Sequence, residues 1–433
     1  MIHRLRDFLS GQQATYLEAL RKLVATESPS NDKAAADRCA DEIAHLLTHG
    51  GFAVERRPMA TIGDVLIGRF APRSAERGEA TAISAADSTT SPTADSTAAT
   101  MSGPTIDAAA SPTVTPTVGS TTGQGDSPLA GPRTLLLAHY DTVWPVGTLT
   151  QMPFTHDGDV IRGPGVADMK AGIVAGALAV AALTHLGRAP AGPVTFLVTS
   201  DEETGSTHSR PLIEELARQH DRVLVLEPAR EDGALKVGRK GVGNYTVTFR
   251  GRSAHAGTEP ERGASALREL AHFLFAAETL SAPDRGTTVN LTVARGGSAT
   301  NVIAEEAVAA LDVRVLAMVE AERVDRALRA YRPHDDRVSL TIDGGLNRPP
   351  FEPGPRHQPL FERCRTLGHA LGLALEAAVV GGGSDGNFTA ALGVPTLDGL
   401  GAVGGGCHAR HEYIRLAASL DRVALLAAFL ATA

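Results

Sequence analysis

Four apolar runs in this sequence are each followed by residues that can bind a metal ion or transfer a proton. These residues are His139 and Asp141, Glu202 and Glu203, Glu227, and His408. A further acid, Asp168, lies in a Gly-Pro-Gly turn before an Ala-rich stretch. Continuous apolar runs predict strands covered on both faces of a parallel sheet, and ligands gather at the carboxyl ends of such strands. We therefore expect these side chains to converge in space.

Converging carboxylates repel one another unless cations lie among them. Two imidazoles among carboxylates suit Zn²⁺ better than Mg²⁺, which prefers an all-oxygen shell. Each residue alone has an ordinary structural explanation, because a single His at a strand end more often packs or caps. Taken together, the imidazoles and carboxylates predict a metal centre.

The pattern of apolar residues along the sequence predicts a main domain with an inserted module. The opening stretch is typical of helices over about Phe8–Thr26 and Asp32–His49, and strands then alternate with helices up to residue 239. Alternating patterns typical of half-buried strands, together with two helices, follow from 240 to 347. The pattern of helices and buried strands then returns from 348 to 433. We expect an α/β catalytic domain, with a mostly parallel sheet flanked by helices, from 1–239 and 348–433, and an inserted α+β module from 240–347.

One segment differs from the rest of the chain in its amino-acid composition. Residues 74–131 are rich in Ser, Thr, Ala and Pro, and residues 81–130 contain no Lys, Arg or aromatic residue. Such a segment buries too little apolar surface to offset the entropy of ordering it, so we expect a disordered low-complexity insertion.

Charge and composition limit the partners. The chain of 433 residues has 49 acidic and 41 basic residues, which leaves no basic excess to neutralise the phosphates of a nucleic acid. We see neither an uninterrupted apolar run of roughly 18 residues nor the apolar core of a signal peptide. The three cysteines, Cys39, Cys364 and Cys407, lack the spacing of metal or disulfide pairs. We expect a cytoplasmic enzyme that binds a small molecule and neither nucleic acid nor membrane.

The stretches around the candidate ligands resemble one known family, the dizinc aminoacylase and carboxypeptidase metallopeptidases, and most closely its glutamate carboxypeptidase branch. The matching stretches are Ala138–Thr142, Gly163–Gly172, Ser200–Gly205, Leu226–Pro228, Gly251–Gly257, Asn301–Ile303 and Gly406–His408. The resemblance implies a zinc-peptidase-like fold in which the inserted module is a lid and dimerisation domain. It also implies hydrolysis of the amide bond of N-acyl or peptidyl amino acids, with release of a C-terminal, glutamate-like residue.

The resemblance further implies roles for individual residues. The implied ligands are His139 and Glu227 for one zinc, Glu203 and His408 for the other, and Asp168 for both. Glu202 would be the general base for the attacking water, and Asp141 would hydrogen-bond the imidazole of His139. The family carries a cis peptide bond after the bridging acid, here between Asp168 and Met169. Each subunit would hold two Zn²⁺ ions, although Co²⁺ or Mn²⁺ suit the same ligands.

The resemblance also implies roles for residues outside the cluster. In the family, the equivalent of His255 stabilises the oxyanion in the active site of the partner subunit, which implies a homodimer. Arg314 and Asn301 resemble a clamp for the free carboxylate of the substrate, because a guanidinium pairs bidentately with a carboxylate. Arg348 resembles a further carboxylate-binding residue, and Ser384 lies in a Gly-rich turn that would line the substrate pocket.

Several alternatives stay open at this point. Arg348 could instead pair with Asp312 or Asp343 on the surface. Lys236, Arg239 and Lys240 form a basic cluster near the domain junction, for which a solvated hinge is the favoured interpretation.

Alternative functions also remain. An N-acyl-amino-acid deacylase, of the aminoacylase or acetylornithine deacetylase type, would use the same metal site. The G-x-S-x-G pattern at 382–386, with Asp398 and His408 downstream, has the chain order of a serine hydrolase. A non-catalytic member of the family would bind peptides only.

Overall fold

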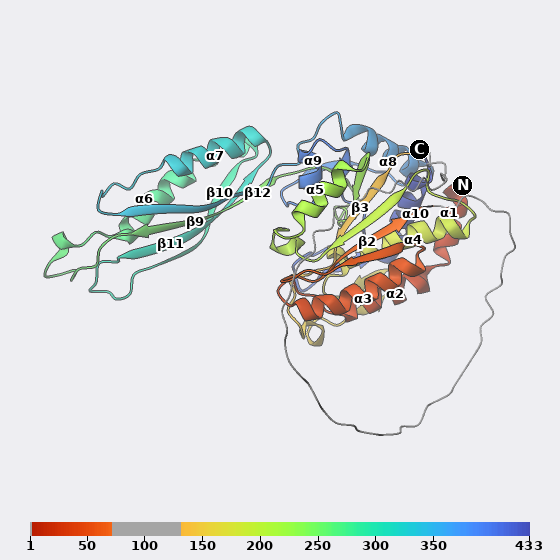
Figure 1. Cartoon of the computed structure of the whole chain (residues 1–433), viewed down its shortest axis with the longest axis horizontal. Helices are drawn as coiled ribbons and strands as arrows, with labels where there is room; N and C mark the ends of the chain where they lie inside the picture. The colour runs from red at the N-terminus through yellow and green to blue at the C-terminus, as the bar shows by residue number, and fades with distance from the viewer. Residues whose placement is uncertain (1, 72–130) are drawn as a thin grey trace, which may run out of the picture. The chain divides into compact units, whose positions relative to one another are not determined.

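The computed structural model of the chain describes residues 2–71 and 131–433. The predicted insertion at 74–131 lies outside the described residues except for Gly131, and the predicted domain boundaries stay a prediction. Two separate sheets carry the regular structure on which the candidate residues lie, a main sheet and the sheet of the inserted module, called the lid sheet below (Figure 1).

The main sheet has six strands in the order β1-β2-β6-β3-β7-β14. The strands are β1 Ala53–Arg57, β2 Val65–Phe70, β3 Thr134–His139, β6 Val194–Thr199, β7 Arg222–Val225 and β14 Thr396–Leu397. Strand β3 pairs in parallel with β6 and β7, and β14 pairs in parallel with β7, whereas β1 and β2 extend the sheet by antiparallel pairing. The predicted mostly parallel sheet, and the return of the C-terminal part of the chain to it, are confirmed.

Helices cover both faces of this sheet because its strands are apolar on both sides. On one side, the sheet shares a hydrophobic core with α1 Ile2–Ser10, α2 Gln13–Ala25, α3 Lys33–His49, α4 Ala171–His185, α8 Gln358–Ala370 and α10 Leu416–Leu430. The other side packs against α5 Arg210–Arg218 and α9 Gly386–Ala391. Figure 1 shows α2 and α3 on one side of the sheet and α5 on the other. The predicted helix over 8–26 is in fact two helices, which are separated by Gly11 and Gln12.

Helix α4 crosses the core directly behind the strand ends. A Cβ atom at Gly172 would lie 2.0 Å from the carbonyl oxygen of Leu226, so only glycine permits this close approach. The stretch Val166–His185 is long and apolar enough to cross a membrane, but 83% of its most apolar window is buried within the protein. Asp168 and Met169 interrupt it with non-helical backbone angles and a cis peptide bond, as the resemblance implies. We interpret α4 as a core helix.

The lid sheet has four antiparallel strands in the order β10-β11-β9-β12. They are β9 Gly241–Arg250, β10 Thr288–Gly296, β11 Glu306–Val315 and β12 Ser339–Arg348. Helices α6 Ala266–Glu278 and α7 Met318–Ala330 pack on one face, and alternate residues of β11 are buried against them. This agrees with the half-buried α+β module predicted from the alternating pattern.

Two small sheets tie loops to this framework. In one, β8 Leu235–Arg239 pairs in parallel with β13 Ala377–Val380. In the other, the order is β15-β16-β5-β4, formed by β15 Gly404–Gly405, β16 Tyr413–Arg415, β5 Val160–Arg162 and β4 Thr155–Asp157. The second sheet joins the segment before Asp168 to the segment after His408.

Candidate metal centre

The five predicted ligands converge at the carboxyl ends of the parallel strands. Nε2 of His139, the last residue of β3, lies 3.2 Å from Oδ1 of Asp168 and 3.5 Å from Oε1 of Glu227. Nε2 of His408 lies 3.3 Å from Oδ2 of Asp168 and 3.0 Å from Oε2 of Glu203. The Asp168 carboxylate therefore stands between the two imidazoles, with one oxygen towards each.

The atoms at the centre of the cluster fit a metal ion. Nε2 of His139 and Oδ1 of Asp168 are buried and have no hydrogen-bond partner. Two sets of potential ligand atoms each lie within 4.8 Å of one another: those of His139, Glu202 and Glu227, and those of His139, Asp168 and Glu203. Because buried polar atoms in proteins are almost always partnered, unpaired nitrogen and oxygen atoms that face each other point to a cation between them.

The electrostatics of the cluster agree with this fit. Burial raises the pKa of Glu202 well above its usual value. Burial acts to lower the pKa of His139, but the surrounding carboxylates of Asp141, Asp168 and Glu227 outweigh it and raise that pKa well above its usual value. Hydrogen bonds to Asp168 and Glu203 raise the pKa of His408 to about 11. The carboxylates thus draw positive charge to their centre, which protons or divalent cations can supply.

Asp141 fixes the loops that present these ligands. Its fully buried carboxylate accepts hydrogen bonds from the main-chain N–H groups of Glu202 (3.2 Å) and Glu203 (3.1 Å). Nδ1 of His139 lies 3.1 Å from the carbonyl oxygen of Asp141 and 3.3 Å from Oδ1. With Nδ1 donating there, Nε2 faces the cluster, and in the neutral imidazole its lone pair would be available to a metal ion.

Arg348 lies at this site, but its contacts differ from both expectations. Nη1 donates to Asp385 (2.8 Å), and Nη2 donates to the Oε1 atom of Glu202 (2.9 Å). The residue is 4% exposed, so the surface pairing with Asp312 or Asp343 is wrong. Its guanidinium anchors the predicted general base, and the structure shows no free fork for a substrate carboxylate.

The basic cluster near the domain junction is not a solvated hinge. Arg239 and Lys236 are buried, at 3% and 8% exposed. Arg239 donates to both oxygens of Asp398, at 2.7 Å each, and its Nη2 lies 3.4 Å from Oε2 of Glu227. Sequence reasoning missed this contact to a candidate ligand, although the close spacing of basic residues near a strand end was visible.

The structure does not support a substrate contact or a nucleophilic role for Ser384. Its buried hydroxyl donates to Asp398 (2.7 Å) and accepts from the N–H of Gly386 (3.1 Å). In the part of the chain that is described, its recorded hydrogen bonds include none to an imidazole. The Ser, Asp, His order of a serine hydrolase is therefore present in the sequence but not in space.

The three lid residues with predicted roles, His255, Asn301 and Arg314, make no recorded contact with the cluster within the described parts of this chain. Nδ1 of the exposed His255 accepts hydrogen bonds from the N–H groups of Gly257 and Thr258, at 3.1 Å each, which leaves Nε2 to carry the proton. Asn301 is exposed, and the Arg314 guanidinium pairs bidentately with Asp312 at 2.8–3.1 Å.

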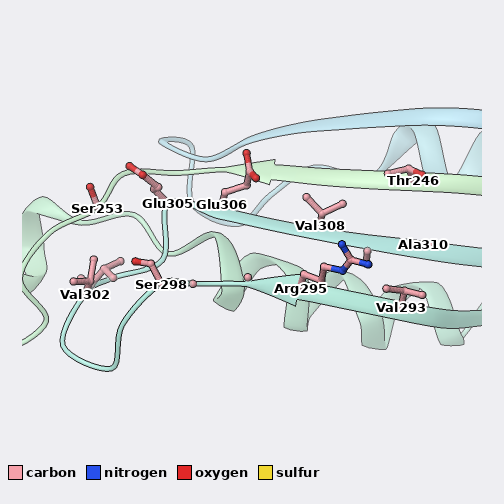
Figure 2. Close-up of a pocket in the computed structure, with 14 residues that line it drawn as sticks. Thr246, Ser253, Val293, Arg295, Ser298, Val302, Glu305, Glu306, Val308 and Ala310 are labelled. Carbon is pink, nitrogen blue, oxygen red and sulfur yellow. The ribbon is translucent and has the colours of Figure 1, made fainter.

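A cavity of about 790 Å³ lies on the face of the lid sheet that α6 and α7 leave open. Figure 2 shows Val293, Arg295 and Val308 along it, with Ser253 and Glu305 towards one end. Its lining includes none of the five predicted ligands, so the cavity is distinct from the metal centre.

Comparison with known proteins places this geometry in a family. The model of peptidase family M20/M25/M40 matches residues 135–432. Carboxypeptidase G2 of Pseudomonas sp. (strain RS-16) is 31% identical over 305 residues, which are 69% of this chain and 73% of that protein. A succinyl-diaminopimelate desuccinylase of Granulibacter bethesdensis is 29% identical over 313 residues, which are 66% of this chain and 79% of that protein.

Solved structures share the fold. The aminopeptidase PepT of Bacillus cereus has a TM-score of 0.71 at 18% identity, over 97% of this chain and 98% of that one. An M20 family metallo-carboxypeptidase of Sulfolobus solfataricus has a TM-score of 0.66 at 15% identity, over 96% of this chain and 98% of that one. With the family match over residues 135–432, the chain belongs to peptidase family M20/M25/M40 and is an enzyme of that metal-dependent hydrolase family.

Proposed function

We propose that the protein is a dizinc hydrolase that cleaves the amide bond of an N-acyl or peptidyl amino acid and releases the C-terminal residue. The observation that carries the proposal is the unpaired, buried pair of His139 Nε2 and Asp168 Oδ1, enclosed by carboxylates in a chain of this family. His139, Asp168 and Glu227 would hold one ion, and Asp168, Glu203 and His408 the other. When bound, the ions would polarise the scissile carbonyl and make the attacking water more acidic.

The contacts of Glu202 support a role in proton transfer. Its Oε1 is anchored by Arg348, whereas its Oε2 lies 4.0 Å from Nε2 of His139 and faces the cluster. One oxygen is thus held while the other is left to take a proton from water and return it to the leaving amine. The His408 side chain is 52% exposed and that of His139 only 2%, so substrate would approach from the side of His408.

The test combines metal content with turnover. We expect the purified protein to carry two zinc ions per chain and to hydrolyse N-acyl amino acids. A chelator should abolish turnover and zinc restore it, whereas a serine-directed phosphonate should have no effect. Glu202→Gln should lower kcat about 10²–10⁴-fold with zinc content unchanged. Absence of zinc uptake, or turnover that survives this substitution, would refute the proposal.

For the leaving group, we propose a glutamate-like residue whose free carboxylate is held by Arg314 and Asn301. Support comes from the resemblance of the sequence motifs to the glutamate carboxypeptidase branch and from similarity to a carboxypeptidase, carboxypeptidase G2. The substrate carboxylate would have to displace that of Asp312, with which the Arg314 guanidinium pairs. Similarity to a desuccinylase favours a second candidate, an N-acyl-amino-acid deacylase. A hydrolysis panel that varies first the C-terminal residue and then the acyl group separates the two. Indifference to the C-terminal residue would favour the deacylase.

We also propose a homodimer in which His255 completes the site of the other subunit. Its free Nε2–H suits a developing oxyanion, and the lid exposes large apolar side chains on α6 and β10, with Phe275 at 72% and Val293 at 46%. Homodimers of His255→Ala and Glu202→Gln should each be nearly inactive. After subunit exchange at equal amounts, about a quarter of wild-type activity should return, because each mixed dimer holds one intact site. No recovery, or a monomeric mass in solution, would refute this.

A cytoplasmic location remains our proposal and has the free state of all three cysteines as support. Fractionation of cells that produce the protein tests it, and recovery outside the cytoplasm would refute it.

A further inference from the structure

The carboxylate of Glu412 is fully buried and accepts four hydrogen bonds. Oε1 accepts from the main-chain N–H groups of Ala167 (2.8 Å) and Asp168 (3.1 Å). Oε2 accepts from the main-chain N–H of Gly165 (3.0 Å) and from the indole Nε1 of Trp144 (3.1 Å). Both oxygens are thus saturated by donors, and three of the donors belong to the turn that carries Asp168.

This turn needs an acceptor from elsewhere in the chain. The backbone of Asp168 and Met169 is non-helical, so the turn forms no regular ladder of its own, and the first N–H groups before a helix have no acceptor within it. Converging N–H groups of this kind form a site that favours an anion. Glu412 supplies that anion from a segment more than 240 residues away in the sequence.

The same residue is linked to the second imidazole. Glu412 follows His408 by four residues, and its N–H donates to the carbonyl of Ala409 (2.9 Å), which closes the turn directly after His408. Directly after it, β16 pairs with β5, with Tyr413 opposite Arg162. This pairing brings Glu412, the residue before β16, to the start of the turn that carries Asp168.

We propose that Glu412 is a positioning residue of the metal centre, whose carboxylate fixes the Asp168 turn relative to His408 so that the Asp168 carboxylate faces both imidazoles. The inference rests on the proposed metal function and goes beyond it, because Glu412 itself contacts neither imidazole and is not among the predicted ligands.

The test is zinc binding by metal-free Glu412→Gln. Glutamine offers one acceptor oxygen and turns an NH₂ group towards donors, so the four hydrogen bonds cannot all remain. We expect zinc affinity, measured by calorimetric titration, to fall about 10–100-fold, the usual cost of losing a group that orients metal ligands. The single tryptophan, Trp144, gives a second readout, since loss of its carboxylate partner should shift its fluorescence emission before any metal is added.

Glu269→Gln is the matched control. Glu269 is also fully buried and accepts a main-chain hydrogen bond, from His334 (2.7 Å), but it lies on α6 of the lid. We expect it to lower the melting temperature without changing zinc affinity or tryptophan emission. Folding of each variant is checked by circular dichroism.

Each outcome decides the matter. If the wild-type protein binds no zinc, the proposed function fails; if it binds zinc and Glu412→Gln binds equally tightly, only the positioning role fails. Should Glu412→Gln not fold, Glu412→Asp replaces it, and wild-type zinc affinity in that shortened carboxylate would overturn the proposal. If neither variant folds while Glu269→Gln does, Glu412 serves the fold alone and the proposal is overturned.

Discussion

Replacing Arg348 by Met should remove a buried cation that bonds two carboxylates, those of Asp385 and Glu202. The guanidinium donates to Asp385 at 2.8 Å and to Glu202 at 2.9 Å, and it donates further to the hydroxyl of Ser206 at 3.1 Å. Asp385 is 3% exposed, so water cannot replace the lost partner. A buried carboxylate left in this way is costly, because its charge is no longer compensated.

The magnitude follows from these contacts. Removal of one partner of a buried ion pair costs about 3–5 kcal/mol, and we expect Arg348→Met to lower the free energy of unfolding by about that amount. Asp385→Asn removes the other charge of the pair. The double variant should therefore be more stable than the sum of the two single changes predicts, by about 0.5–3 kcal/mol.

Urea unfolding of the metal-free protein at pH 7, followed by circular dichroism, measures these free energies. A loss below about 1 kcal/mol for Arg348→Met, or strictly additive effects in the cycle, would refute the reasoning. Kinetics give a second readout for Arg348. If it anchors Glu202, kcat should fall while KM changes little, whereas a substrate clamp would show a raised KM at nearly constant kcat.

Three further perturbations test other parts of the structure. Burial acts to raise the pKa of Asp64, but two basic partners and a main-chain N–H lower it to about 2. Asp64→Asn should therefore lower the free energy of unfolding by about 2 kcal/mol at pH 7, and this difference from the wild type should vanish as the pH falls from about 4 towards 2. Urea unfolding at several pH values measures the difference, and a difference that does not depend on pH would contradict the prediction. Gly172→Ala places a Cβ atom 2.0 Å from the carbonyl oxygen of Leu226, beside Glu227, and should lower stability by about 1–3 kcal/mol and weaken zinc binding. Gly381→Ala, where a Cβ atom would meet nothing within 4 Å, is its control in thermal unfolding, and equal effects of the two would argue against the steric reason. Finally, zinc at 100 times its dissociation constant should stabilise the fold by about 2.7 kcal/mol per site, and a chelator should reverse the rise in melting temperature; an unchanged melting temperature would contradict a built metal site.

The elements and the set of candidate ligands were accessible from the sequence because both depend on local patterns. Continuous apolar runs predicted β3, β6 and β7, and alternation predicted the half-buried strands of the lid. In a parallel sheet the carboxyl ends of the strands meet at one edge, so ionisable residues after those runs had to converge. That rule brought His139, Glu202 and Glu227 together before any distance was known.

The partners of buried charges were not accessible in this way. Arg239 and Arg348 look like surface residues in a hydrophilic stretch, and Ser384 looks like a nucleophile, yet each is buried in a hydrogen-bond network. Glu412 carries no local signal of the turn it holds. Such pairs form between segments far apart in the sequence. The local sequence around a basic residue therefore does not predict which carboxylate will accept its hydrogen bonds. The periodicity of apolar residues determines which side chains face the core. The partner of a buried polar group, in contrast, is determined only when folding brings distant segments into contact and excludes water from between them.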